Sequence, residues 1–364
     1  MTQHPANSSA ANFNAAMLQL ARSARSLTQE EVANKSGVTQ ALLSKIENRL
    51  VETPSPEVVA SISRALGFPT SFFYQRNDVL GLSHFHHRKR SKLGAKPLGR
   101  IHAITNIRRI HIERLLNSWE KESSKPIPQI DIDQDGLNPS QLAARMREYW
   151  LAPRGPIANL VDLVESAGGI IVLSDFGTAL LDGISFRIPG LPPLFFMNSQ
   201  APGDRFRFSL AHELGHMIMH TVPDDDERME RQADEFAAAF LMPAQDIRPY
   251  LSTASLSKFG RIKPLWRVSI KSLIKRSHDL RLITNHQYKM LNIEYNKAKY
   301  GSGEPYPIEL EKPRLLHRLV QHHLEVLGYS VAELAKMLCV NEPDFARAYL
   351  PSRGPLRLVV SNDT

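Results

Sequence analysis

The stretch from Phe206 to His220 carries the pattern His-Glu-x-x-His, with the two histidines at positions 212 and 216. Side chains four residues apart lie on the same face of an α-helix, so this segment must be helical for both imidazole rings to meet. Apolar residues fill most other positions, which predicts that the helix packs inside a core. We expect His212 and His216 to bind a single Zn²⁺ per chain.

Glu213 lies between these histidines and is rotated by about 100° from His212 around the helix axis. It is poorly placed to ligate the metal but can take a proton from a water molecule there, so we expect it to be the catalytic base. A catalytic zinc has a third protein ligand. His220 continues the row of histidines, but its rise of ~12 Å along the helix from His212 makes it an unsuitable ligand.

The third ligand is expected from the acidic helical pattern between Glu227 and Leu241. Glu230 and Asp234 are four residues apart, which places them on one face of this helix. We expect Glu230 to bind the metal and Asp234 to accept the free N–H of a ligand histidine, which fixes the tautomer of that ring. Glu227 and Glu235 are competing carboxylates, but neither has an acidic residue four positions further on.

The run from Leu27 to Asn48 has the spacing of two short helices joined by a tight turn. Thr28 and Thr39 are suitable N-caps, and Gly37 stands where the turn needs a positive φ. The apolar positions that can form the buried side are Val32, Val38, Leu42 and Ile46. The run therefore predicts a helix-turn-helix.

The outer face of the second of these helices is polar. It consists of Thr39, Gln40, Ser44, Lys45 and Asn48. In helix-turn-helix proteins the second helix enters the major groove of DNA, N-terminal end first. Gln and Ser side chains can read base edges there, while Lys, Asn and Gln29 at the start of the first helix can hold phosphates. We expect double-stranded DNA as a partner at these residues.

Two resemblances together cover a little under half of this chain. Residues 13–74 closely resemble the phage-repressor-like (XRE-type) helix-turn-helix family, although Arg49 stands where that family often has glycine. Residues 140–245 resemble the ImmA/IrrE family of zinc metallopeptidases. That resemblance is carried by the stretches Arg205–His216 and Glu230–Pro243 and by Tyr149, Trp150, Gly155, Pro156, Ile157, Leu160, Gly169, Asp182 and Gly183.

The second resemblance implies a zincin-type fold, in which a small sheet packs on the active-site helix and Glu230 ligates the zinc as in gluzincins. It also implies cleavage of a helix-turn-helix repressor, in a response to stress or to a mobile element. A peptide substrate could lie along an exposed sheet edge near residues 183–198. A fusion of a repressor-like domain with the peptidase also occurs in that family.

The expected fold class is α+β. We divide the chain into a helix-turn-helix domain (1–80), a basic linker and helix (81–138), a zincin-like peptidase domain (139–250) and a mostly helical C-terminal region (251–364). The apolar run at 169–173 reads as a strand, and the stretch 183–198 alternates strand-like segments with Pro-containing turns. Helices are expected near 205–220 and 227–241.

Charge is unevenly distributed in the sequence. Residues 1–125 and 251–300 each carry a net charge of +9, with a dense basic run at 84–92, whereas residues 201–250 carry −5. Basic blocks favour polyanions. For residues 251–300, Ser269 and Thr284 can cap two helices, and both a second helix-turn-helix-like unit and a plain basic helical buttress remain open.

The single cysteine, Cys339, permits no intrachain disulfide, and we expect it to be a core residue. No long apolar run and no leader pattern are visible, so we expect a cytoplasmic protein that does not enter membranes.

The motifs together predict a transcriptional regulator that binds DNA and also acts as a zinc-dependent endopeptidase on a repressor or on itself. We expect a homodimer, because repressor-like domains often dimerise. The alternative is a repressor or antitoxin without enzymatic activity, in which the zinc site is structural or sensory.

Overall fold

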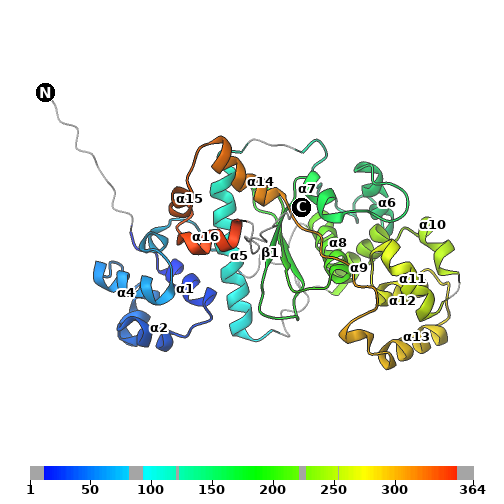
Figure 1. Ribbon diagram of the computed structural model, residues 1–364, viewed down its shortest axis with the longest axis horizontal. Helices are drawn as coiled ribbons and strands as arrows, with labels where there is room; N and C mark the ends of the chain where they lie inside the picture. The colour runs from blue at the N-terminus through cyan, green and yellow to red at the C-terminus, as the bar shows by residue number, and fades with distance from the viewer. Residues whose placement is uncertain (1–11, 82–92, 120–122, 221–226, 253, 351–364) are drawn as a thin grey trace, which may run out of the picture. The chain divides into compact units, whose positions relative to one another are not determined.

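The computed structural model describes residues 12–81, 93–119, 123–220, 227–252 and 254–350. The basic run at 84–92 lies outside these residues. The architecture is α+β, as predicted, with many helices and one small sheet (Figure 1). Within the described ranges, no helix combines the length and the apolar character needed to cross a membrane.

The chain forms two compact units. The first consists of Met1–Val79, His102–Trp119 and Leu316–Thr364, and the second consists of Leu80–Ile101 and Glu120–Leu315. The segment 251–364, which we predicted as one C-terminal region, is therefore divided between them. The domain boundaries expected from the sequence therefore stay a prediction.

The first unit begins with a helical bundle. Its helices are α1 (Ala15–Ala24), α2 (Gln29–Ser36), α3 (Gln40–Glu47) and α4 (Pro56–Leu66), followed by a 3₁₀ turn at Thr70–Tyr74. Thr28 forms a capping box with Glu31, Gly37 ends α2 at φ 71°, and Thr39 caps α3. Each of these local features is the one predicted from the sequence.

The buried side of this bundle differs from the prediction at one position. Val32, Val38 and Ile46 are buried as expected, but Leu43 is fully buried in place of Leu42, which is only partly buried. Leu43 lies three and four residues before Ile46 and Glu47, so these three side chains share the buried face of α3. Leu42 lies beside that face, at the rim of the core. Phe72 and Phe73 close that core from the 3₁₀ turn.

The remaining helices of the first unit come from distant parts of the sequence. They are α5 (Ala95–Leu116), whose residues from His102 onward belong here, α14 (Leu315–Gln321), α15 (Val331–Met337) and α16 (Glu342–Tyr349), with a π-helical turn at His322–Val326. Leu115 of α5 shares a core with Leu319, Leu334 and Phe345. This shared core explains why residues after Leu315 leave the second unit. Cys339 is only half-buried.

The second unit contains the sheet. Strands β1 (Ile170–Ser174), β2 (Gly183–Phe186) and β3 (Leu194–Asn198) lie in the order β1-β3-β2. The pair β1 and β3 is parallel, and the pair β2 and β3 is antiparallel. All residues of β2 and β3 are buried, and apart from Ser185 and Asn198 none of their side chains is polar.

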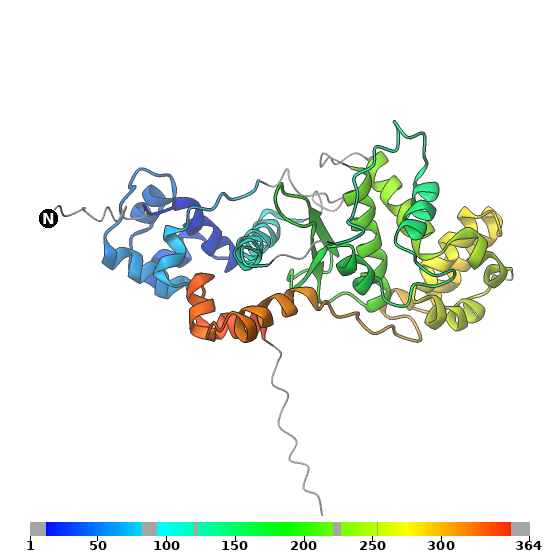
Figure 2. The same cartoon turned by 90° about the horizontal axis from the view of Figure 1, so that it is seen from above.

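One long helix packs on the sheet, and a second long helix packs on the first. Helix α8 (Gly203–Met219) contacts β2 and β3 and packs along α9 (Glu227–Leu241). Helices α6 (Pro139–Tyr149) and α7 (Leu160–Ser166) complete the core. Seen from above, α8 and α9 lie between the sheet and the yellow helices α11–α13 (Figure 2).

The helices beyond α9 are short. They are α10 (Ala244–Ile247), a 3₁₀ turn at Arg248–Leu251, α11 (Leu256–Trp266), α12 (Ile270–Asp279), α13 (Asn285–Lys297) and a 3₁₀ turn at Tyr300–Ser302. Ser269 caps α12 and Thr284 caps α13, as predicted. A nucleic-acid partner for this part of the chain stays a prediction.

A buried ion pair ties the start of α8 to the segment after the last 3₁₀ turn. The side chains of Arg207 and Glu311 are 1% and 3% exposed and form a salt bridge. Glu311 also accepts hydrogen bonds from the backbone N–H groups of Leu160 (2.8 Å) and Val161 (3.0 Å) at the start of α7. One carboxylate therefore satisfies three buried donors from two helices.

Removal of this carboxylate should destabilise the second unit strongly. We expect Glu311→Ala to lower the free energy of unfolding by about 3–5 kcal/mol, because the charge of Arg207 remains buried without compensation. The exposed pair of Arg145 and Asp135 (3.4 Å) is the control, and Arg145→Ala should cost less than about 1 kcal/mol. Urea unfolding followed by tryptophan fluorescence measures both, and equal effects would contradict this account.

Candidate functional site

Helix α8 presents His212 and His216 on one face. Their Nε2 atoms lie 3.0 Å apart, and the carboxylate of Glu230 on α9 approaches both of them. Glu230 Oε1 is 3.3 Å from His216 Nε2, and Oε2 is 3.7 Å from His212 Nε2. These side chains offer ligand atoms that all lie within 4.8 Å of one another. The three predicted metal ligands are thus brought together.

The close packing of α8 against α9 makes this convergence possible. At Gly215 an added Cβ atom would lie 3.0 Å from Cδ1 of Phe236 and 3.4 Å from the Cα atom of Ala233. Phe236 is fully buried and stacks on Phe240 at a centroid distance of 5.4 Å. Glycine at this position lets α9 approach α8 closely enough for Glu230 to face the histidines.

The competing carboxylates lie elsewhere on α9. Glu227 pairs with Arg231 at the surface (3.3 Å), and Glu235 is exposed and accepts a hydrogen bond from Ser140 (2.7 Å). Glu230, by contrast, is buried. Position 235 is five residues from 230 and so faces another side of the helix, whereas Glu227 is the first residue of α9, one turn before Glu230.

Glu213 is buried but does not belong to the His212, His216 and Glu230 group. Its Oε2 atom accepts a hydrogen bond of 2.6 Å from Ser185 Oγ on β2. Burial raises the pKa of Glu213 to about 7, although His212 and Ser185 act to lower it. A carboxyl group that gains and loses a proton near neutral pH is suited to act as a general base.

Ser185 was not predicted from the sequence. It lies in the strand Gly183–Phe186, which is buried throughout. The one signal in the sequence was a hydroxyl residue between two large apolar residues. At Gly183 of the same strand, an added Cβ atom would lie 3.1 Å from Glu213 Cγ. The backbone of β2 therefore passes directly beside the carboxylate.

Asp234 is placed as predicted for a partner of His212. Its Oδ1 atom lies 2.9 Å from His212 Nδ1. Burial acts to lower the pKa of His212, but the hydrogen bond to Asp234 and the charges of Glu213, Asp234 and Glu230 outweigh it, so that pKa is raised. With Nδ1 donating to Asp234, the Nε2 atom of His212 is left to face Glu230.

His220 is not a member of the ligand group, in agreement with its helical spacing. Its ring instead contacts His216, with the two Nδ1 atoms 2.9 Å apart. His220 is 8% exposed and lies at the end of α8, where the backbone becomes extended.

A pocket opens onto the candidate metal centre. It has a volume of about 340 Å³. Its lining residues are Leu181, Asp182, Gly183, Arg205, Phe208, Ser209, His212, Glu213, Glu230 and Asp234. Arg205 forms a salt bridge of 2.9 Å with Asp182 at this pocket.

Strand β2 is an edge strand in the sheet order, and each of its residues is buried, with α8 packed against the strand. Between β2 and β3, Pro189 and Gly190 are exposed. That a peptide lies along a sheet edge near residues 183–198 stays a prediction. The pocket at the candidate metal centre opens beside Asp182 and Gly183.

The predicted DNA-binding residues lie on α3 and at the start of α2. Thr39, Gln40, Lys45 and Asn48 are exposed, whereas Ser44 is partly buried and its hydroxyl accepts from Asn48 (3.3 Å). Gln29 is partly buried and donates to Glu47 (2.7 Å), so its amide is engaged within the domain. Glu47 also pairs with Arg22 and fastens the end of α3 to α1.

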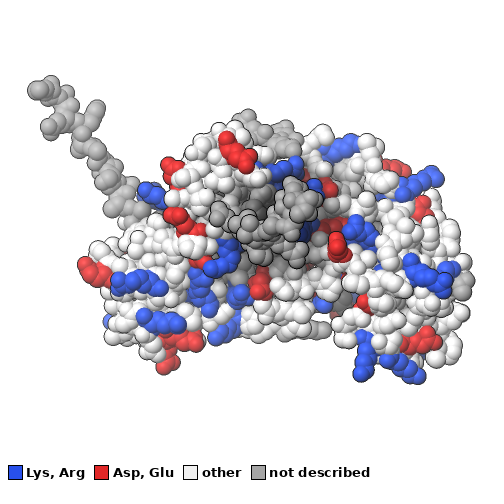
Figure 3. Space-filling model, in the orientation of Figure 1, with Lys and Arg blue, Asp and Glu red and all other residues white. Residues whose placement is uncertain are grey.

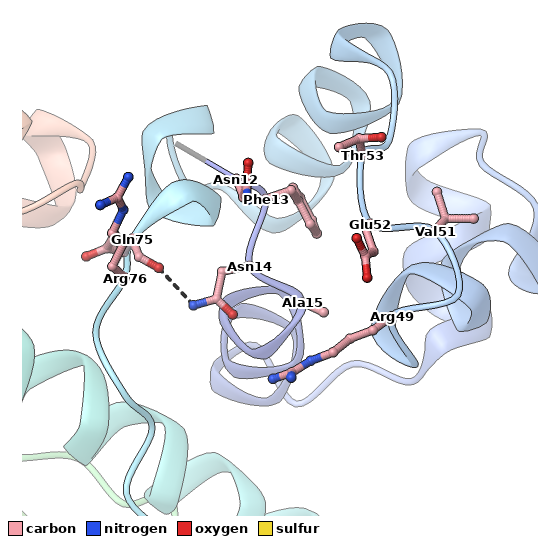
Figure 4. A pocket seen from close by; sticks show the side chains of 10 residues that line it. All are labelled: Asn12, Phe13, Asn14, Ala15, Arg49, Val51, Glu52, Thr53, Gln75 and Arg76. Carbon is pink, nitrogen blue, oxygen red and sulfur yellow. Dashed lines mark hydrogen bonds between the residues drawn. The ribbon is translucent and has the colours of Figure 1, made fainter. Parts of the chain in front are cut away.

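A second and larger pocket adjoins the end of α3. Its volume is about 740 Å³, and Phe13, Arg49, Glu52 and Arg76 are among its lining residues (Figure 4). Asn14 Nδ2 donates to the backbone oxygen of Gln75 there (2.8 Å). The pocket holds no convergent set of metal-ligating side chains comparable to that on α8 and α9, among the residues that the structure describes.

On the face shown in Figure 3, Lys and Arg side chains and Asp and Glu side chains are interspersed.

The chain combines a helix-turn-helix with a His/His/Glu group and an adjacent buried glutamate, the arrangement of a metallopeptidase-like site. Comparison with known proteins agrees. Residues 18–73 match the helix-turn-helix family model, and residues 165–278 match a peptidase-family model described as the IrrE N-terminal-like domain. No curated protein matches the chain. The chain therefore joins a helix-turn-helix domain to an IrrE N-terminal-like domain, as the sequence resemblance implied.

The contact at Gly215 leads to a prediction about the packing of the two site helices. Gly215→Val should lower the free energy of unfolding by about 1–3 kcal/mol, because the added methyl groups overpack the contact with Phe236. At Gly99 in α5 an added Cβ atom meets nothing within 4 Å, so Gly99→Val should change stability by less than about 0.5 kcal/mol. Thermal unfolding of both variants checks this, and an unaffected Gly215→Val protein would refute close packing here.

Proposed function

We propose that this chain is a DNA-binding transcriptional regulator with zinc-dependent endopeptidase activity. The observation that carries the peptidase part is the convergence of His212, His216 and Glu230 beside the buried carboxylate of Glu213. The DNA-binding part is supported by the helix-turn-helix match and by the exposed polar face of α3.

The donor set fits one Zn²⁺ per chain. Two imidazole nitrogens and one carboxylate form the ligand set of catalytic zinc sites that leave one position open. When bound, zinc polarises the scissile carbonyl and stabilises the negative charge that develops on its oxygen. The ligands proposed to hold it are His212, His216 and Glu230.

The chain's own residues divide the remaining tasks. Glu213 takes a proton from the attacking water and returns it to the leaving amine. Ser185 holds Glu213 through the hydrogen bond at Oε2, so the carboxylate is oriented before a substrate arrives. Asp234 keeps the Nδ1 proton of His212 in place, which directs Nε2 toward the metal.

The proposed substrate is a folded protein's exposed segment rather than a small molecule. The pocket of about 340 Å³ is open to solvent at Arg205 and Asp234, whose side chains are 43% and 44% exposed, and an extended peptide can enter it there. The resemblance to repressor-cleaving peptidases points to a helix-turn-helix repressor or to this chain itself, in a response to stress or to a mobile element.

A structural or sensory zinc site is the alternative function. A structural site uses closed coordination and has no need of a general base. The placement of Glu213 beside the ligand group, with a hydrogen bond from Ser185, favours the enzyme. We place the protein in the cytoplasm with its DNA and propose a homodimer, because helix-turn-helix dimers match two half-sites.

The assignment of the third ligand predicts a contrast among three carboxylates of α9. Glu230→Ala should lose bound zinc, since a catalytic site needs its third protein ligand. Glu227→Ala and Glu235→Ala are matched controls on the same helix and should keep about one zinc per chain. Zinc content of the purified proteins by atomic emission checks this, and full zinc occupancy in Glu230→Ala would refute the assignment.

The role of Glu213 predicts that zinc binding and cleavage separate. Glu213→Gln should retain zinc, because Glu213 is not a ligand, and should lose cleavage because the amide cannot take a proton. Zinc-loaded protein is incubated alone and with helix-turn-helix proteins encoded beside its gene, and products are identified by mass spectrometry. Cleavage by Glu213→Gln at the wild-type rate would exclude this mechanism.

The exposed face of α3 predicts two different effects on DNA binding. Gln40→Ala should cost about 1–3 kcal/mol on the specific operator and little on random DNA, because glutamine can pair with adenine. Lys45→Ala should weaken binding to both alike and reduce its salt dependence, since a phosphate contact carries no sequence information. Fluorescence anisotropy at several salt concentrations measures both, and equal losses on both DNAs for Gln40→Ala would disprove base readout.

A further inference from the structure

A chain of hydrogen bonds leads away from His216 on the side opposite the candidate metal centre. His216 Nδ1 lies 2.9 Å from His220 Nδ1, and His220 Nε2 lies 3.0 Å from Gln232 Oε1 on α9. The extended backbone of His220 (φ −113°, ψ 109°) turns its ring back along the helix, and the two imidazole rings lie 5.0 Å apart.

The direction of the hydrogen bonds along this chain follows from its last member. The amide oxygen of Gln232 can only accept, so His220 must donate from Nε2. A neutral imidazole carries one N–H, so Nδ1 of His220 is an acceptor and Nδ1 of His216 must donate to it. The Nε2 atom of His216, which faces Glu230 at 3.3 Å, is then left with its lone pair.

The reverse direction is incompatible with metal binding. If the amide of Gln232 were rotated to donate, Nδ1 of His220 would carry the proton and Nδ1 of His216 would accept it. The proton of His216 would then sit on Nε2 and point into the ligand group. Only the direction that starts from His216 Nδ1–H leaves Nε2 without a proton, so the orientation of one amide decides whether His216 can be a ligand.

We propose that His220 and Gln232 are positioning residues that hold His216 in the Nδ1–H tautomer and thereby prepare its Nε2 atom for the metal. This inference rests on the proposed metal site of His212, His216 and Glu230. The ring of His220 is too far along α8 to be a ligand itself. It links Gln232 on α9 to His216, so that the amide of Gln232 determines which nitrogen of His216 carries the proton.

Burial explains why the two ligand histidines have different partners. Asp234, the partner of His212, has a side chain that is 44% exposed, so its charge is solvated. The side chain of His216 is 1% exposed, and the carboxylates of Glu213 and Glu230 are already buried nearby. A third buried carboxylate there would be costly, whereas a neutral histidine and an amide fix the tautomer without adding charge.

The relay is tested by the zinc affinity of full-length variants, measured by competition with a chromophoric chelator. Gln232→Leu and His220→Phe should each weaken zinc binding by about 10–100-fold, as the loss of a partner behind a ligand does. Gln232→Glu keeps an acceptor at this partly buried position and should therefore bind zinc more tightly than Gln232→Leu. Arg231→Leu, at the exposed neighbouring position, is the matched control and should have no effect.

The double variant separates a relay from two independent contributions. If Gln232 acts only through His220, then Gln232→Leu should have no further effect in the His220→Phe background. Additive losses would overturn the relay, as would wild-type affinity in both single variants. Gln232 is only partly buried, so the Gln232→Leu variant is the informative one if His220→Phe does not fold.

The tautomer itself is measured on the metal-free protein by ¹⁵N NMR of labelled histidines. His216 should carry its proton on Nδ1 in the wild type and in Gln232→Glu, and should lose this preference in Gln232→Leu. An Nε2–H tautomer of His216 in the wild type would overturn the relay. Failure of the wild type to bind zinc would instead overturn the proposed metal site, so the two failures are distinguishable.

Discussion

The contact between α8 and α9 at Gly215 determines what the second unit can do. Helix α8 carries two of the three candidate ligands and α9 carries the third. They meet because Gly215 has no Cβ atom, and Phe236 of α9 packs into the space that such an atom would take. The same contact buries an aromatic stack of Phe236 and Phe240, so the apolar packing that stabilises the unit also sets the distance from Glu230 to the histidines. Stability and site geometry therefore depend on one interface.

This arrangement buries several charged side chains, and each of them has a polar or oppositely charged partner close by. Glu213 accepts a hydrogen bond from Ser185, and Glu230 faces His212 and His216. At the start of α8, Arg207 is neutralised by Glu311, and Lys263 is paired with Asp204 (2.5 Å) and Glu304 (2.8 Å). These pairs anchor α8 at the end away from His216, where a shift of the helix would move both ligands together.

Much of this could be predicted from the sequence because it is local. The spacing of His212 and His216, the spacing of Glu230 and Asp234, and the caps at Thr28 and Thr39 each follow from helical geometry, and the structure brings these residues to the expected places. Features that depend on contacts between residues distant in the sequence could not be predicted from the sequence. Glu311 is 104 residues from Arg207, and neither Ser185 nor Gln232 carries a local pattern that marks it.

The account depends on a metal ion held jointly by the two helices. The most direct measurement is anomalous diffraction at the zinc edge from crystals of the full chain grown with zinc. The account predicts one strong anomalous peak per chain, within bonding distance of His212 Nε2, His216 Nε2 and the Glu230 carboxylate, with Glu213 beside it but not bound to the ion. A peak at other residues, or no peak between α8 and α9 in zinc-saturated crystals, would contradict it.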